Sequence, residues 1–230
     1  MSVARIEPTA HALPADLLRE TNHRISNHLT LLAGMIQTHA SAVARGPETL
    51  PREAARSILQ EVAGKVIGVG HLHRRLSDRP GDQGIHVCEY LIGSCTALIS
   101  SLALGERAYV VQHLTADCLI SPDQAQKIGL LVNEIVMNAV KHAHPTGLPV
   151  QIAIGCRRES SGRFTIEVGD DGVGLPEGSD AATTGGVGIG LIRSLAQSLK
   201  ADLRIESDSL GLTFLLMLPA PMHAVATDAR

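Results

Sequence analysis

Apolar residues in the first third of the chain recur at helical spacing. Between about residues 15 and 44 they follow one another at intervals of seven, four and three, which predicts one long helix. A second helix is predicted over residues 52–76, after a turn marked by Gly46, Pro47 and Pro51. The apolar stripes consist of Leu18, Ile25, Leu29, Leu32 and Ile36 in the first helix, and Ile58, Val62, Val66, Val69, Leu72 and Leu76 in the second. The simplest cover for such a hairpin is a second copy of itself, which gives a homodimeric four-helix bundle.

The rest of the chain mixes helical and strand patterns. A helix is expected over residues 86–104 and strand material over 108–121, after which Ser121 and Pro122 form the start signal of a helix that reaches 144. The predicted strands that follow are residues 150–156, 163–169, 201–208 and 212–218. This mixture predicts an α+β protein, in which the hairpin precedes an α/β sandwich with helices on one face of a sheet.

The boundary between the two parts is expected at residues 78–81, which read Asp-Arg-Pro-Gly. The predicted organisation is a flexible tail over residues 1–14, the helical hairpin over 15–80, the sandwich domain over 81–219 and a tail over 220–230. Within the second domain, the small and polar residues 176–185 are expected to form a flexible lid.

Composition and charge narrow the function classes. The formal net charge is −3, no basic run is present and the chain has no Trp, so nothing favours a nucleic-acid partner. No apolar stretch is long enough to span a bilayer, and the N-terminus lacks the pattern of a signal peptide. The four cysteines, Cys88, Cys95, Cys118 and Cys156, lack C-x-x-C spacing and are interpreted as small buried residues in a reducing compartment. We therefore expect a cytoplasmic protein without membrane insertion.

A helix-forming stretch near the middle of the chain carries several functional side chains. In residues 131–144, Glu134, Asn138 and Lys141 fall on one helix face at spacings of four and three, and His142 adjoins them. A carboxylate and a carboxamide offer oxygen ligands to a hard cation such as Mg²⁺, and an ammonium group suits phosphate. An amphipathic helix with a solvated face gives the same pattern and, for this stretch alone, is the commoner explanation.

Two glycine clusters follow this helix. A strand-like segment breaks into residues 170–174 (D-D-G-V-G), and residues 185–190 (G-G-V-G-I-G) run into an apolar helix. Glycines let the backbone approach a phosphate closely, and a helix N-terminus offers free N–H groups to an anion. One such cluster is weak evidence, whereas the helix and both clusters in this order are a specific signal.

Together, the three segments resemble the N-box and the two glycine boxes of the ATP-binding domain shared by gyrase, the Hsp90 chaperone, sensor histidine kinases and MutL, which has the Bergerat fold. The run N-E-I-V-M-N-A-V-K-H-A at residues 133–143 is similar to that of histidine kinases related to the HWE group, which carry Glu at the first N-box position. Residues 211–219 resemble the last strand of that domain, and the resemblance extends from about residue 84 to residue 219.

The resemblance implies a role for each of these side chains, with ATP and Mg²⁺ as the cofactors. Asn138 would coordinate magnesium, Lys141 would contact phosphate, and Asp170 would hydrogen-bond the adenine amino group. Glu134 would be either a base or a residue of the magnesium shell. The other implied nucleotide contacts are His142, Gly172, Gly174, Gly186, Gly188, Gly190 and Thr213, and the role of His142 is not separable from packing.

The first predicted helix carries a second motif, which reads E-x-x-H-R-I-x-N from Glu20 to Asn27. At about 100° per residue, His23 lies roughly 160° from the apolar stripe, and Asn27 lies beside it one turn on. The motif resembles the phospho-acceptor helix of the same kinase subclass, in which the His before Arg takes the phosphate. Glu20 is the candidate base, because Arg24 stands where the largest kinase subclass has an acidic residue. His28, about 60° from the stripe, is the rival acceptor.

These features predict the core of an ATP-dependent protein histidine kinase that autophosphorylates His23 and passes the phosphate to an aspartate of a response-regulator receiver domain. No sensor domain precedes the hairpin, so the input is expected from a separate sensor protein or through the N-terminal tail. The alternatives are a phosphotransferase that shuttles phosphate between regulators, an anti-sigma-like serine kinase and a structural adaptor. The nucleotide motifs argue against the first, the His23 motif argues against the second, and ATP binding would exclude the third.

Overall fold

The computed structural model describes residues 49–77, 84–115, 118–176 and 187–219, together with part of the stretch from 26 to 46. In that stretch the described positions are 26, 29–30, 32–34, 36–38, 40–41 and 43–46. Those up to residue 44 are helical, as the first apolar stripe predicts, and Thr30 Oγ1 donates a hydrogen bond to Ser26 O at 2.9 Å within this helix. Both predicted tails and residues 177–185 of the predicted lid lie outside the described residues.

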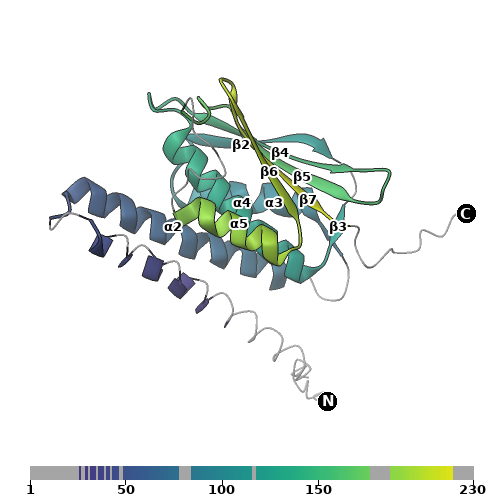
Figure 1. Cartoon of the computed structure of the whole chain (residues 1–230), viewed down its shortest axis with the longest axis horizontal. Coiled ribbons are helices and arrows are strands. Elements are labelled where there is room, and N and C mark those ends of the chain that lie inside the picture. Colours follow the sequence, from purple (N-terminus) through teal and green to yellow (C-terminus); the bar gives the residue numbers. More distant parts are fainter. Residues whose placement is uncertain are drawn as a thin grey trace, which may run out of the picture.

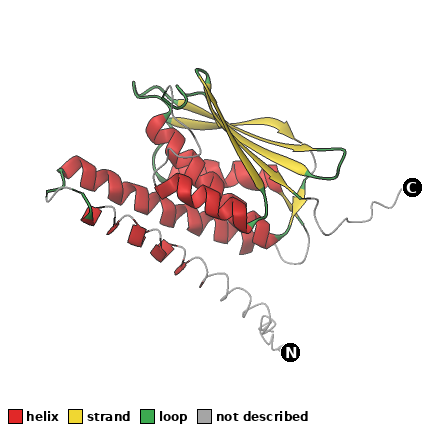
Figure 2. Ribbon diagram, viewed as in Figure 1, coloured by secondary structure: helices red, strands yellow, loops and turns green. Residues whose placement is uncertain are grey.

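The described chain forms an α+β architecture with its helices on one side of a mixed sheet (Figures 1 and 2). The complete helices are α2 (Arg52–Ser77), α3 (Val87–Ser101), α4 (Pro122–His142) and α5 (Val187–Ser198). The five-stranded sheet has the order β2 (Ala108–Thr115), β4 (Val150–Arg158), β5 (Phe164–Asp170), β7 (Gly211–Leu218) and β6 (Asp202–Asp208). β2 runs parallel to β4 and the other neighbours are antiparallel, which confirms the expected fold class.

Alternation along the strands creates a single core between the sheet and the helices. On β5 and β7, Val168 pairs with Phe214 and Ile166 with Leu216, and all four side chains are buried on the helix side. Residues between them, such as Leu215, point to the other face and are only half-buried. The central helix α4 supplies the opposite wall of the core through residues that include Ile128, Leu131, Ile135 and Val136.

Helix α4 begins where the sequence predicts it. Ser121 Oγ accepts a hydrogen bond from the Gln124 backbone N–H at 3.2 Å, and Gln124 Oε1 accepts one from the Ser121 N–H at 3.0 Å. This reciprocal pair satisfies two helix-terminal donors, and Pro122 at the first helical position needs none. The predicted strand material before it is divided. Its last part, β3 (Leu119–Ile120), pairs with β1 (Ile85–His86) in a separate two-stranded sheet.

The second hairpin helix, α2, packs along α3 and α4 of the same chain (Figure 1). Val69 and Leu72 are buried in the common core, although the apolar stripe of the hairpin was expected to be covered by a second copy. Gly64 lets α2 approach α4 closely, because a Cβ on Gly64 would lie 2.9 Å from Met137 Cε. Leu59 and Val66, the second of which belongs to the predicted stripe, stay exposed. None of the helices described here is long and apolar enough to cross a membrane.

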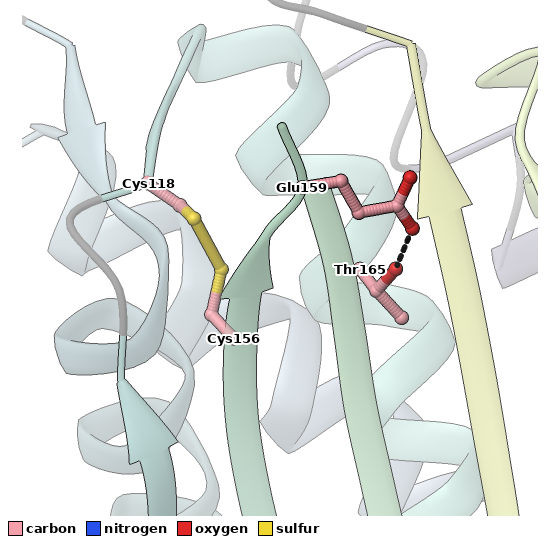
Figure 3. Close-up of a disulfide and its surroundings, with 4 residues drawn as sticks. All are labelled: Cys118, Cys156, Glu159 and Thr165. Carbon is pink, nitrogen blue, oxygen red and sulfur yellow. Dashed lines mark hydrogen bonds between the residues drawn. A yellow bond between two sulfur atoms is a disulfide. The ribbon is translucent and has the colours of Figure 1, made fainter. Parts of the chain in front are cut away.

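Two of the four cysteines are joined by a disulfide and the other two are free, which corrects the expectation that all four are unpaired. Cys118 and Cys156 form a disulfide that ties the segment before β3 to β4, and Figure 3 shows this bond near the Thr165–Glu159 hydrogen bond. Cys88 and Cys95 are buried free thiols, and burial raises the pKa of Cys88 to about 11 and that of Cys95 to about 12. These two thiols fit the predicted role of small buried residues.

Candidate functional site

Glu134, Asn138 and Lys141 project from successive turns of α4, in the order that leads from the core to solvent. Glu134 is 4% exposed, Asn138 is half-buried, and the Lys141 side chain is 48% exposed. Helix α5 begins beside them, because a Cβ built on Gly188 would lie 3.3 Å from Glu134 Oε2 and 3.3 Å from Asn138 Oδ1. Gly188, in the second glycine cluster, therefore lies against the polar face of α4, and a larger residue at position 188 would crowd both side chains.

An ion-pair network extends this polar face onto α2. Lys65 Nζ lies 3.1 Å from Glu134 Oε2 and 3.3 Å from Glu61 Oε1, and Lys141 Nζ lies 3.3 Å from Glu61 Oε2. Burial raises the pKa of Glu134, and the Lys65 ammonium group opposes that shift. The sequence analysis did not single out Lys65 or Glu61. Their only local signal is the spacing of four, which also describes an ordinary surface pair.

The first glycine cluster forms a turn at the end of β5. The Gly172 backbone N–H donates a hydrogen bond to Asp170 Oδ1 at 3.0 Å. Burial raises the pKa of Asp170, while hydrogen bonds from the backbone of Gly172 and Leu212 counteract the shift. A half-buried carboxylate at the end of a central strand can accept a hydrogen bond from a ligand that enters between sheet and helices.

The same turn is fitted closely to the end of α4. A Cβ on Gly172 would lie 2.6 Å from Ala143 Cα, and the Val173 N–H donates a hydrogen bond to Ala143 O at 3.0 Å. Gly174 has a positive φ of 68°, and a side chain there would meet Ser207 and the Asp208 carbonyl. The turn therefore joins β5 both to α4 and to the β6–β7 connection. The backbone conformation and close packing at position 174 explain the glycine there without any contact to nucleotide.

A second carboxylate in this turn has a structural role that the sequence did not reveal. Asp171 Oδ1 accepts a hydrogen bond from the Gln151 N–H at 2.9 Å and lies 3.0 Å from His144 Nε2. These contacts connect the segment after α4 to the beginning of β4 and to the Asp170 turn. They hold the first glycine cluster in place beside the polar face of α4.

Other predicted site residues are not brought together with this group. Thr213 pairs with Gly169 on the outer face of the sheet, and Leu212 is the residue opposite Asp170 on the inner face. His142 lies at the end of α4, where partial desolvation of its imidazole, followed by the Lys141 charge, lowers its pKa. Gly190 faces open space in the first turn of α5. The predicted residues that lie outside the described part of the chain are Glu20, His23, Asn27, His28 and Gly186.

The residues present fit a magnesium–nucleotide ligand. Asn138 and Glu134 supply neighbouring oxygens of the kind that magnesium prefers, Lys141 supplies a cation at the solvent edge, and the start of α5 suits an anion. In the described part of the chain, no three His, Cys, Asp or Glu side chains cluster as a metal site. Magnesium bound together with phosphates needs only one or two protein ligands, so this arrangement is sufficient.

The sequence matches two families of known proteins. The family described as "Histidine kinase-like ATPase domain" matches residues 96–214, and the family described as "Histidine kinase" matches residues 20–102. Among solved structures, the histidine kinase domain of a blue-light-activated histidine kinase from Erythrobacter litoralis superimposes with a TM-score of 0.63. It is 25% identical, and the match covers 88% of this chain and 93% of that one.

Two curated relatives show the same relationship in sequence. Blue-light-activated histidine kinase 2 of Erythrobacter litoralis is 28% identical over 200 residues, which is 84% of this chain and 54% of the relative. Sensor histidine kinase PdtaS of Mycobacterium tuberculosis is 25% identical over 183 residues, or 79% of this chain and 34% of the relative. The chain thus spans about half of the first protein and a third of the second. The two family matches, which together extend from residue 20 to residue 214, show that this chain belongs to the histidine kinases and carries their ATPase domain.

Proposed function

We propose that the chain is the catalytic core of an ATP-dependent protein histidine kinase, which autophosphorylates His23 and passes the phosphate to an aspartate of a response-regulator receiver domain. One observation supports this proposal most strongly. The end of α4, the turn after β5 and the start of α5 converge, through Gly172 against Ala143 and Gly188 against Glu134 and Asn138. This convergence supports a site in which oxygen ligands, a cation and a helix N-terminus lie on neighbouring elements.

Within this proposal, the described residues divide the work of holding the nucleotide. Asp170 accepts the hydrogen bond of the adenine amino group, and Lys141 approaches the phosphates from the solvent edge. Asn138 and Glu134 are the ligands or near neighbours of magnesium, which would neutralise phosphate charge when it is bound. We do not assign Thr213 to the site, because it faces away from Asp170.

The phospho-acceptor is proposed from the motif and the family match over residues 20–102, because His23 lies outside the described residues. A neutral imidazole nitrogen of His23 would form a bond to the γ-phosphorus while the bond from that phosphorus to the ADP oxygen breaks. Glu20 is the candidate base for the imidazole proton. Asn27, one turn along, would position a water for the removal of phosphate from the partner, since a carboxamide has no useful pKa.

A homodimer through the helical hairpin is part of the proposal. Leu29, Ile36 and Val43 are exposed at intervals of seven, and Leu59 and Val66 on α2 are exposed at the same interval. Unpaired apolar stripes of this kind are the usual seams of helical bundles. We also propose the division into a hairpin over residues 15–80 and an ATP-binding domain over 81–219. A separate sensor protein and a cytoplasmic location, where ATP is available, complete the proposal.

Radiolabelled ATP tests the proposed activity directly. The wild-type chain, incubated with the labelled nucleotide and magnesium, should acquire a label that is labile in acid and stable in base, as phosphohistidine is. His23→Ala should abolish labelling while ATP binds with wild-type affinity, and His28→Ala should still take the label. Label that survives in His23→Ala and disappears in His28→Ala would move the acceptor, and an acid-stable label would favour the serine kinase alternative.

A further inference from the structure

Lys65 is a buried cation on α2 that lies against the polar face of α4. Its side chain is 3% exposed, and its ammonium group contacts both Glu134 on α4 and Glu61 on its own helix. Glu61 uses its other carboxylate oxygen to hold Lys141 at 3.3 Å. Two ammonium groups and two carboxylates therefore follow one another in the order Lys141, Glu61, Lys65 and Glu134.

The position of Glu134 Oε2 places this cation at the proposed metal site. The oxygen that lies 3.1 Å from Lys65 Nζ is the same one that lies 3.3 Å from the Cβ position of Gly188. That position is also 3.3 Å from Asn138 Oδ1. Magnesium held by Glu134 would therefore have to share this carboxylate with the Lys65 ammonium group.

Such sharing is unfavourable, because two cations next to one carboxylate repel each other and buried charges are poorly screened. The network also contains a way to relieve the repulsion. Phosphate would attract Lys141 away from Glu61, and the ion pair between Glu61 and Lys65 would then become stronger. Glu134 would at the same time become available to magnesium.

We propose that Lys65 is a positioning residue of the magnesium–nucleotide site, an internal counter-ion that holds Glu134 until the metal replaces it. Loading of magnesium and nucleotide then transfers Lys65 to Glu61 and weakens the contact between α2 and α4. By thermodynamic reciprocity, docking of α2 lowers the affinity for magnesium to the same extent. This inference rests on the proposed function, since it requires a nucleotide to bind at this site.

The test measures how strongly magnesium improves the binding of a non-hydrolysable ATP analogue, as the ratio of the dissociation constants without and with the metal. Lys65→Met should increase this ratio about tenfold, which corresponds to the loss of one competing close charge. Lys65→Arg should restore the wild-type ratio, because it returns the charge. Lys127→Met is the matched control, because Lys127 pairs with Asp123 in the first turn of α4, and it should leave the ratio unchanged.

Glu61→Gln provides an independent arm, because Lys65→Met leaves Glu134 buried without a counter-ion and is at risk of not folding. With Glu61 removed, Lys65 loses the carboxylate to which it is proposed to transfer, and the ratio should fall. Amide hydrogen exchange in α2 of the wild-type chain should become faster with magnesium and analogue than with the analogue alone.

The two levels of the proposal fail in different ways. A wild-type chain that does not bind the analogue would overturn the proposed function and this inference with it. A wild-type chain that binds, together with unchanged ratios in the folded variants or unchanged exchange in α2, would overturn this inference alone.

Discussion

The Gly172 backbone N–H donates a hydrogen bond to Asp170 Oδ1 across a distance of 3.0 Å. The carboxylate that we assign to adenine recognition therefore also closes the turn in which it stands. Asp170 has a second oxygen, and its burial makes a hydrogen bond to that oxygen more valuable than it would be in water. The Asp170 side chain therefore contributes both to the fold of its turn and to the proposed recognition of adenine. Substitutions can separate these two contributions.

Asp170→Ala should weaken nucleotide binding roughly ten- to a hundred-fold, because a charge-assisted hydrogen bond in a buried site contributes about 1.5–3 kcal/mol. Asp170→Asn keeps an oxygen that can accept from Gly172, so it should fold normally and still bind the nucleotide less well. Isothermal titration with ATP would measure both affinities. Wild-type affinity in the folded alanine variant would show that the nucleotide site is assigned wrongly.

Gly172→Ala should destabilise the chain by about 1–3 kcal/mol, the usual cost of overpacking. The added methyl group would lie 2.6 Å from Ala143 Cα and would push the turn after β5 away from α4. Nucleotide affinity should fall as well, because this contact sets the position of Asp170. Gly105→Ala is the matched control, since a Cβ there meets nothing within 4 Å. Equal urea midpoints for the two variants would contradict the prediction.

His71 should make stability depend on pH. It links α2 to α3 through Ser101 Oγ at 2.7 Å, and it accepts a hydrogen bond from Arg74 at 3.1 Å through Nδ1. Burial, followed by the charges of Arg74 and Arg75, lowers its pKa in the folded chain below the ordinary value of 6.5. The unfolded chain then binds more protons just below pH 6.5, so the stability contribution is present above that value and is lost as the pH falls toward the folded pKa.

Urea unfolding on both sides of about pH 6.5 measures this contribution. His71→Gln cannot titrate and should show a smaller loss of unfolding free energy on acidification than the wild type. Identical slopes in the two proteins would argue that other groups cause the acid sensitivity.

A charge on the exposed face of α2 should dissociate the proposed dimer. Leu59 is 70% exposed within one chain, so Leu59→Glu should leave the isolated fold intact and disrupt a seam between copies. Leu210→Glu, at a residue that is 79% exposed in the β6–β7 turn, is the control and should remain dimeric. Light scattering distinguishes the two states, and a monomeric wild type at micromolar concentration would count against the bundle.

Replacing Cys118 and Cys156 together by serine should reduce the free energy of unfolding by about 4 kcal/mol, given the chain-entropy cost of opening a loop with a sequence separation of 38. A reducing agent should lower the stability of the wild type toward that of the double variant and should not affect the variant itself. Urea unfolding with and without reductant gives both values. A wild type that is insensitive to reductant would show that the bond does not contribute.

The local signals in the sequence were sufficient for the helices and for the polar face of α4. The start of α4 was predictable because Ser121, Pro122 and Gln124 act within one turn. The grouping of Glu134, Asn138 and Lys141 follows from helical periodicity alone. Resemblance to the kinase domain was needed to place Asp170 and Gly188 beside them, because no local pattern reports which turns of a chain converge.

Other features depend on contacts between distant segments. The pairing of Lys65 with Glu134 requires the way in which α2 packs on α4, which spacing within either helix does not determine. Thr213 was assigned to the site because of its motif. Strand register decides on which face of the sheet its side chain lies, and a shift of one residue would move the side chain to the other face. The partner of Cys118 was likewise not predictable, since four cysteines without a spacing pattern leave both the pairing and the free state open.

The Cys118–Cys156 bond closes a covalent loop of chain that contains the whole of α4, because residues 122–142 lie between the two cysteines. Glu134, Asn138 and Lys141 therefore belong to a closed loop of chain that also includes β3 and residues 150–156 of β4. A protease that cuts once inside this loop, for example at residues 145–149, would leave the two fragments joined. The nicked protein would migrate as one species until a reductant released the pieces, so the loop gives the nucleotide helix a tether that survives a break in its own backbone.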